Sequence, residues 1–252
     1  MSKTVLITGA TSGIGLATAK IFAKNNFNLI ICGRRENRLN ELKQELGKET
    51  KIAVLVFDVR DKNEVSKKIS SLSSDYKNID ILINNAGNAH GFAAIDEGSL
   101  DDWDAMIDIN VKGLLYVSKA IIPGMVDRKK GHIINIGSIA GKEVYAKGNV
   151  YCASKFAVDA ISAGMRIDLN AHGIKVSEVK PGAVDTEFSS VRFKGDKEKA
   201  DKVYQGFEPL MAEDVAEVIY FVATRPAHVN IADTIVFPIA QASASVINRS
   251  GS

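Results

Sequence analysis

The chain has 252 residues, which is about the size of one large α/β domain. Its 46% hydrophobic and 25% charged residues are typical of a globular protein, and a net charge of +2 gives no reason to expect nucleic acid or a membrane surface as a partner. Two cysteines, Cys32 and Cys152, are too few for a disulfide framework, and no stretch reaches the length of a signal segment or a membrane span, so we expect a cytoplasmic protein.

Short apolar runs alternate with amphipathic stretches along the whole chain. The apolar runs predict strands over residues 4–8, 28–32, 51–57, 79–83, 132–136, 175–179 and 233–238. The stretches between them predict helices over residues 15–25, 36–46, 62–72, 99–127, 149–171 and 212–224. Strands rich in Val, Ile and Leu on both sides need cover on both faces. This order therefore predicts an α/β fold, a Rossmann-type doubly wound parallel sheet in a single domain over residues 1–252.

Residues 185–207 are an exception to this alternation, because they are polar, rich in Lys and without strong periodicity. They follow the end of a strand, where parallel sheets bind their ligands. We expect them to form a flap over a ligand, with a solvated loop as the alternative.

A glycine-rich turn joins the first strand to the first helix. Its spacing, Gly-x-x-x-Gly-x-Gly, permits a tight turn and a close approach of backbone to a pyrophosphate. The helix N-terminus adds free N–H groups and a partial positive charge. The turn therefore predicts a dinucleotide site made by Gly9, Thr11, Ser12, Gly13, Ile14 and Gly15.

The second predicted strand ends in two arginines where NAD-binding sites commonly carry an acid. Arg34 and Arg35 follow this strand, and the first acid is Glu36. Planar guanidinium groups suit a 2′-phosphate through charge-assisted hydrogen bonds, so we expect NADP(H) as the cofactor. A pair of solvated arginines is the alternative.

Two further strand ends supply candidates for the adenine and ribose contacts of this fold. Asp58 and Val59 follow the third strand, and Asn85, Ala86 and Gly87 follow the fourth. Turn chemistry is the alternative for each segment, since Asn and Gly serve turns equally well.

Tyr151 and Lys155 stand four residues apart in a helical pattern and so share one face, about 6 Å apart along the axis. An ordinary tyrosine has a pKa near about 10, and a neighbouring ammonium favours the phenolate. The pair predicts proton transfer by Tyr151, although such a pair also occurs by chance. Ser138 follows the fifth strand and can orient a carbonyl oxygen. Asn110, within a long helical pattern, either holds water or is a satisfied polar residue between helices.

Segments 8–15 and 84–87, together with Asn110, Ser138 and the Tyr151-x-x-x-Lys155 pair, resemble the classical short-chain dehydrogenases/reductases over nearly the whole chain. Pro181-Gly182 belongs to the same pattern. The resemblance implies that Tyr151 is the catalytic acid/base and that Lys155 lowers its pKa and binds the nicotinamide ribose.

It further implies that Ser138 positions the substrate oxygen and that Asn110 anchors a water in a proton relay. The resemblance adds four residues near the nicotinamide carboxamide and the pyrophosphate: Pro181, Gly182, Val184 and Thr186. It also implies a homo-oligomer that acts on a small-molecule substrate; members of the family are usually tetramers or dimers, and we expect a homotetramer. No metal site is expected.

A narrower resemblance, carried by segments 33–35, 186–196 and 226–231, is to the NADP-dependent 3-hydroxy acid dehydrogenases. It implies a small anionic hydroxy compound as substrate (serine, allo-threonine or a 3-hydroxy acid) and a carbonyl form such as malonic semialdehyde. Related members reduce sulfoacetaldehyde. Arg192 is the candidate anchor for the anionic group through bidentate pairing, with an exposed charge as the alternative.

Other functions stay open at this point. A 3-oxoacyl-carrier-protein reductase, or a relative acting on steroids or sugars, often ends its last strand with paired glycines, which residues 233–240 lack. A regulator that senses NADPH without turnover is the non-enzymatic alternative, and the presence of all four catalytic residues argues against it. Lys142 and Glu143 put charges near the expected substrate mouth, and Asp185 puts an acid near the pyrophosphate segment, without an evident reason.

Overall fold

Seven parallel strands form one sheet in the computed structural model, which describes residues 2–250. Their order is β3-β2-β1-β4-β5-β6-β7, so the sheet grows outward in opposite directions from the neighbouring strands β1 and β4. The strands are β1 Thr4–Thr8, β2 Asn28–Gly33, β3 Ile52–Val56, β4 Ile81–Asn84, β5 Gly131–Ile136, β6 Ile174–Pro181 and β7 Asp233–Val236. The predicted doubly wound, Rossmann-type sheet is confirmed, and its switch between β1 and β4 places a crevice at their carboxyl ends.

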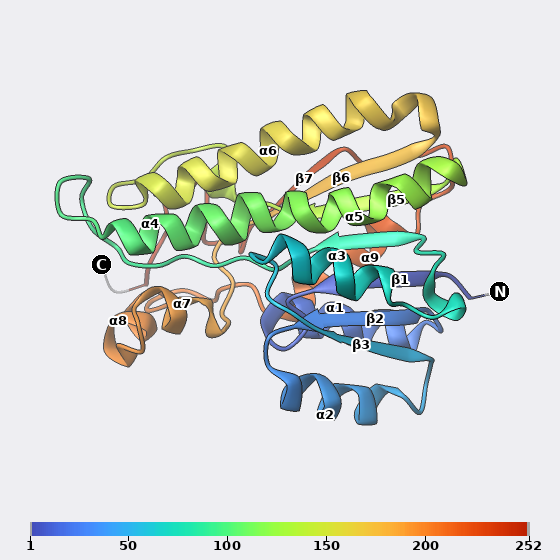
Figure 1. Ribbon diagram of the computed structural model, residues 1–252. Coiled ribbons are helices and arrows are strands. Elements are labelled where there is room, and N and C mark those ends of the chain that lie inside the picture. The colour runs from blue at the N-terminus through green and yellow to red at the C-terminus, as the bar shows by residue number, and fades with distance from the viewer. Residues whose placement is uncertain (1, 251–252) are drawn as a thin grey trace.

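Helices cover both faces of this sheet (Figure 1). One face carries α1 Gly13–Lys24, α2 Glu36–Leu46 and α9 Ala212–Ala223. The other carries α3 Lys62–Ser70, α4 Leu100–Ile107, α5 Leu114–Asp127 and α6 Asn149–Leu169. Apart from the two regions described below, the predicted ends of helices and strands differ from the observed ones by a residue or two.

Alternate residues of each central strand pack on opposite sides of the sheet. In β1, Leu6 packs into the core shared with α3 and α5, whereas Ile7 packs into the core shared with α1 and α9. Both side chains are fully buried. Burial of a side chain of this size contributes about 1.5–3 kcal/mol, so an uninterrupted apolar strand is stable only when helices cover it on both sides.

The helix predicted over residues 99–127 is interrupted. Between α4 and α5 the chain forms a π-helical turn, Asp108–Gly113, which contains Asn110. Such a turn inserts one extra residue into a helix and often marks a functional site. The apolar periodicity on either side of the turn hides this interruption from a sequence-based prediction.

The segment 185–207 contains two short helices, α7 Glu187–Arg192 and α8 Lys197–Lys202. The side chains of Thr186 and Asp196 cap their N-termini by accepting from backbone N–H groups. Helices of one or two turns leave too few residues for a detectable period, so the sequence pattern did not predict them. Figure 1 shows both helices below the end of the sheet where the strands finish.

Within residues 2–250, no helix combines the length and the apolar character needed to cross a membrane.

Candidate active site

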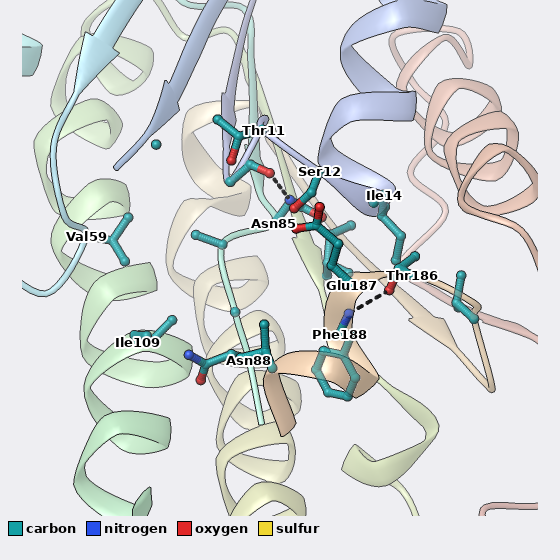
Figure 2. Close-up of a pocket in the computed structure, with 18 of the residues that line it drawn as sticks. Thr11, Ser12, Ile14, Val59, Asn85, Asn88, Ile109, Thr186, Glu187 and Phe188 are labelled. Atoms are coloured by element: carbon teal, nitrogen blue, oxygen red, sulfur yellow. Dashed lines mark hydrogen bonds between the residues drawn. The ribbon is translucent and has the colours of Figure 1, made fainter. Parts of the chain in front are cut away.

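A cleft of about 330 Å³ opens at the carboxyl ends of the central strands (Figure 2). It is lined by every residue predicted to bind the cofactor except Gly15, and by Ser138. Sequence reasoning missed nine lining residues: Gly33, Phe57, Asn88, Ile109, Ile136, Gly137, Glu187, Phe188 and Val191. Most are neighbours in sequence of predicted residues, whereas Ile109 and the flap residues reach the cleft only through the tertiary fold.

The glycine-rich turn forms a cradle of backbone. Gly9 has φ +67°, and a Cβ there would lie 2.9 Å from Asn85 Nδ2. Gly13 has φ +50°, and a Cβ there would lie 3.2 Å from Thr186. The side chain of Ser12 does not cap α1, so the first N–H groups of this helix can donate to an anionic ligand such as a pyrophosphate.

Gly15 faces the protein and not the cleft. A Cβ at this position would overlap the carbonyl oxygen of Gly9, so Gly15 permits close packing of α1 against the turn. Its assignment as a cofactor contact is therefore corrected to a packing role. Asn85 fastens the turn from the other side, because its Nδ2 donates to the carbonyl oxygens of Thr8 and Gly9 at 2.9 and 3.2 Å.

Arg35 is held in the cleft wall by hydrogen bonds from its guanidinium group. Its Nε and Nη2 donate to Thr11 Oγ1 at 3.0 and 2.8 Å, and Nη2 also donates to Ser12 Oγ at 2.7 Å. Its Nη1 donates to Glu187 of α7 at 2.8 Å, and Arg38 donates to the same carboxylate at 2.7 Å. Arg35 therefore lies directly beside the glycine-rich turn. A dinucleotide with a 2′-phosphate requires this arrangement, in which a 2′-phosphate site adjoins a pyrophosphate site.

Arg34 is exposed, and its Nη1 lies 3.7 Å from Asp58 Oδ2. Burial works against ionisation of Asp58, but hydrogen bonds from Arg60 outweigh it and hold the pKa of this carboxyl below its ordinary value. Asp58 therefore stays an anion at the rim of the cleft, and Arg60 neutralises it.

Tyr151 and Lys155 lie on α6 and are both buried. Lys155 Nζ stands 5.9 Å from the centroid of the Tyr151 ring and donates to the carbonyl oxygen of Ile136 at 3.0 Å. Ser138 shares a hydrogen bond with Tyr151. The three side chains that were predicted to act together therefore meet at the end of β5.

The predicted lowering of the Tyr151 pKa is not observed in this structure. Burial of the phenol raises its pKa and outweighs the opposing effects of Ser138 and Arg192. Burial also lowers the pKa of Lys155 to about 8, against the opposing charge of Glu178. A phenol with a raised pKa is protonated at neutral pH, which suits it to donate a proton to an oxygen that is gaining negative charge.

Asn110 lies in the π turn and is buried outside the cleft. Its Nδ2 donates to the carbonyl oxygen of Asn88 at 2.8 Å and to Ser154 Oγ at 3.0 Å, and its Oδ1 accepts from the N–H of Asn88 at 2.9 Å. This side chain is thus the satisfied polar residue that the sequence left as an alternative. A Cβ at Gly87 would lie 3.1 Å from Asn110 Oδ1 and 3.7 Å from Lys155 Nζ, so the two side chains approach the same face of this glycine.

Arg192, at the end of α7, lies over three aromatic rings. Its guanidinium carbon is 4.7 Å from the centroid of Phe92, 5.4 Å from that of Tyr145 and 5.7 Å from that of Tyr151. Its Nε is buried and has no hydrogen-bond partner in the described part of the chain. The alternative of an exposed flap charge is therefore wrong, and a cation with an unused donor stands beside Tyr151.

Lys142 and Glu143 do not line the cleft. Lys142 Nζ lies 3.0 Å from Asp159 and 3.4 Å from Asp233, and Glu143 Oε2 accepts from the N–H of Ala244 at 2.9 Å. Both charges are taken up by these contacts, so the expectation that they shape the substrate mouth is corrected.

Asp185 joins the flap segment to the loop before α9. Its backbone N–H donates to the carbonyl oxygen of Leu210 at 2.8 Å.

Among the described residues, no cluster of three or more His, Cys, Asp or Glu side chains could hold a metal ion.

The chain belongs to the short chain dehydrogenase family, whose sequence model matches residues 3–197. The NADP-dependent 3-hydroxy acid dehydrogenase YdfG of Salmonella typhi is 47% identical over 248 residues, which cover 98% of this chain and 99% of the relative. Sulfoacetaldehyde reductase 2 of Chromohalobacter salexigens is 43% identical over 251 residues, covering 99% of this chain and all of the relative. Both resemblances inferred from the motifs are thereby confirmed.

Among solved structures, the closed form of a serine dehydrogenase complexed with NADP+ is 47% identical. It superimposes with a TM-score of 0.92 over 96% of this chain and 98% of that one. Serine dehydrogenase from Escherichia coli, at 41% identity, gives a TM-score of 0.83 over 95% of this chain and 99% of that one. Sequence identity and structural superposition therefore both support the fold and the assignment to this family of dehydrogenases.

Proposed function

We propose that this chain is an NADP(H)-dependent oxidoreductase that interconverts a small anionic hydroxy compound and its carbonyl form. The observation that carries the proposal is the position of Arg192. A guanidinium group with an unused, buried Nε lies 5.7 Å from the ring of the proton donor Tyr151. A carboxylate bound there puts a nearby hydroxyl or carbonyl oxygen within reach of the phenol.

The residues of the cleft fit NADP(H). The uncapped N-terminus of α1 and the backbone of Gly9 and Gly13 would hold the pyrophosphate, and Arg34 and Arg35 would hold the 2′-phosphate. Structural relatives with NADP bound support this assignment. When bound, the nicotinamide supplies the hydride chemistry.

Proton transfer is the task of the protein itself. Tyr151 donates a proton to the substrate oxygen during carbonyl reduction and accepts it during alcohol oxidation, and the Ser138 hydroxyl positions that oxygen. The ammonium group of Lys155 stabilises the phenolate left after donation. We assign to Asn110 the support of a water in the relay that reprotonates this site, since its side chain ties the π turn to the backbone of Asn88.

The substrate class is serine, allo-threonine or a 3-hydroxy acid, with a carbonyl form such as malonic semialdehyde. The names of the relatives, a 3-hydroxy acid dehydrogenase and a serine dehydrogenase, support it. The short separation of Arg192 and Tyr151 favours compounds whose hydroxyl lies a few bonds from the anion over acyl thioesters. Sulfoacetaldehyde is the second candidate, because a sulfonate satisfies the same guanidinium group and a reductase of that substrate is 43% identical.

A panel assay tests this proposal. Purified enzyme is given NADP+ with L-serine, allo-threonine and 3-hydroxypropionate, and NADPH with malonic semialdehyde, sulfoacetaldehyde and a 3-oxoacyl thioester. Turnover of the short acids with none of the thioester supports the assignment. Turnover of the thioester alone identifies a 3-oxoacyl-carrier-protein reductase, and binding of NADPH without any turnover identifies a sensor.

Residues 185–207 act as a flap over the cofactor in this proposal. The contacts that tie them to the rest of the molecule include Glu187 to Arg35 and Arg38, the carbonyl oxygen of Arg192 to the N–H of Gly91 at 2.9 Å, and Lys194 to Asp102 at 2.9 Å. Since these contacts lie on both sides of the cleft, breaking them is required for the cofactor to leave.

Two further parts of the proposal concern the assembly and its location. We assign a homotetramer on the family resemblance, which light scattering of the purified protein tests. We assign the cytoplasm because both cysteines are free and buried, as suits a reducing compartment.

A further inference from the structure

Five charged side chains form a charge cluster behind the candidate active site, with Glu178 and Lys180 buried at its inner end and Lys142, Asp159 and Asp233 partly exposed at its outer end. Lys180 is fully buried at its centre, with Nζ 3.0 Å from both Asp159 and Glu178 and in contact with Asp233. Lys142 Nζ closes the cluster on the outside through Asp159 and Asp233. Neither the cofactor nor the proposed substrate contacts require this cluster.

The charges of the cluster do not cancel. Two ammonium groups face three carboxylates, so the cluster carries one excess negative charge. Its innermost carboxylate is Glu178, which is 1% exposed and whose Oε1 has no hydrogen-bond partner among residues 2–250. A buried, unsatisfied carboxylate oxygen calls for a counter-charge nearby.

Lys155 is the cation on that side of the cluster. Glu178 Oε1 lies against the backbone of Gly137, where a Cβ would overlap it. Gly137 directly follows Ile136, whose carbonyl oxygen accepts from Lys155 Nζ at 3.0 Å. On α6, Tyr151, Lys155 and Asp159 are spaced four residues apart, so one stripe of this helix faces both the active site and the cluster.

We propose that Glu178 is a positioning residue that holds Lys155 in its charged form from behind β5, with Lys180 keeping Glu178 itself ionised. The inference rests on the proposed role of Lys155 in proton transfer. The pKa directions agree with the geometry: burial lowers the pKa of Lys155 to about 8, and the charge of Glu178 opposes this decrease. Burial and the charges of Asp159 and Asp233 raise the pKa of Glu178, while Lys180 opposes that change.

Glu178 is the carboxylate whose charge acts on Lys155 in the described chain, whereas Glu178 itself also pairs with Lys180 on its own strand. Lys155 faces Tyr151 on its own helix, and it faces uncharged groups of Ile136, Gly87 and Asn110 on β5, the loop after β4 and the π turn. Asp159 from α6 and Asp233 from β7 disfavour the ionised form of Glu178, and Lys142 lies beside them.

The test is the pH dependence of kcat/KM for Glu178→Gln. Loss of the carboxylate disfavours the ammonium form, so Lys155 loses its proton at a lower pH, and the alkaline limb of the profile moves to lower pH by about one unit or more. The Glu178→Asp variant keeps the charge but withdraws it from Gly137 by one methylene, and we expect a smaller shift in the same direction. At pH 6, where Lys155 is charged in every variant, the Kd for NADPH stays within about twofold of the parent value.

Asp233→Asn is the matched control, because it removes one carboxylate from the exposed end of the cluster, where solvent screens the charge. We expect its alkaline limb to stay with that of the parent. The inference is overturned if the alkaline limb of Glu178→Gln lies at the same pH as that of the parent, or if Glu178→Gln and Asp233→Asn show equal shifts. If Glu178→Gln does not fold, an unshifted alkaline limb in Glu178→Asp is sufficient to overturn the inference.

A Tyr151→Phe variant measured alongside separates this failure from a failure of the proposed mechanism. Full turnover in Tyr151→Phe contradicts the proposed mechanism and, with it, the role of Lys155. If Tyr151→Phe is inactive and the alkaline limb of Glu178→Gln is unshifted, the mechanism is retained and only the role of Glu178 is contradicted.

Discussion

The two ends of the cleft are built in different ways. At the cofactor end, the wall is backbone: Gly9 and Gly13 hold positive φ angles, and the uncapped first turn of α1 offers its N–H groups. At the substrate end, side chains from distant segments meet in a small pocket that adjoins the cleft at Tyr151, where Arg192 from the flap lies over the rings of Phe92 and Tyr145. A backbone cradle serves any dinucleotide, whereas a set of side chains selects one substrate class. The predictions below test this division of labour.

Tyr151→Phe carries the largest expected effect. Loss of the phenol hydroxyl removes the proton donor, so kcat falls by about 10²–10⁴-fold. The cofactor end contains no contribution from this hydroxyl, so the Kd for NADPH stays within about twofold. Steady-state kinetics and fluorescence titration with NADPH measure the two quantities. Tyr116→Phe, on α5, is the matched control. If Tyr151→Phe has the same kcat as Tyr116→Phe, the mechanism is contradicted.

Arg192→Met tests the substrate end. Removal of the guanidinium group eliminates a charge-assisted hydrogen bond to the anionic substrate, which lowers kcat/KM for short hydroxy acids by about 10–100-fold. Binding of NADPH is expected to stay unchanged. Lys194→Met removes a cation from the same flap, but one that pairs with Asp102, and serves as the control. Equal losses in both variants would mean that flap charge in general, and not Arg192, selects the substrate.

Replacement of both Arg34 and Arg35 by Ala tests the cofactor end. The variant loses charge-assisted bonds to the 2′-phosphate, so its selectivity ratio for NADPH over NADH falls by about tenfold or more. The measurement is kcat/KM for each cofactor at constant ionic strength, with Arg225→Ala, near the start of β6, as the control. An unchanged ratio refutes the assignment of these arginines to the 2′-phosphate.

Glu187→Gln carries the smallest effect and tests the link between the two ends. Its ion pairs with Arg35 and Arg38 are partly exposed, so their loss costs no more than about 1 kcal/mol and raises the KM for substrate by a few-fold through a looser flap. Glu198→Gln removes a flap carboxylate that pairs only within α8 and is the control. The same KM in both variants contradicts a role of Glu187 in closure.

Most of the cofactor end was predictable from the sequence. Gly9, Gly13, Arg34 and Arg35 were assigned from their places between strands and helices, and the structure lines the cleft with all four. Gly15 was misassigned, because a glycine needed for packing and one needed for a ligand look the same in a sequence. Glu187 was missed because nothing in its surroundings indicates that it meets Arg35, 152 residues away.

The substrate end was predictable only in part. The spacing of Tyr151 and Lys155 placed both on one face of a helix, but it did not reveal that burial raises the pKa of the phenol. Four residues along a helix determine a distance, whereas the pKa depends on how much water surrounds the phenol, and that is a property of the packed site. Lys142 and Glu143, predicted at the substrate mouth, point to other partners for the same reason.

The order of apolar strands and helices determined the fold, because each strand needs cover on both faces and each parallel connection needs a crossover. The glycine spacing and the strand ends likewise determined where a dinucleotide belongs. The tertiary structure alone decided which side chains share a buried environment: Arg192 with three aromatic rings, and Glu178 with the backbone beside Lys155. Periodicity acts over a few residues, but burial and charge pairing join segments that only the folded chain brings together.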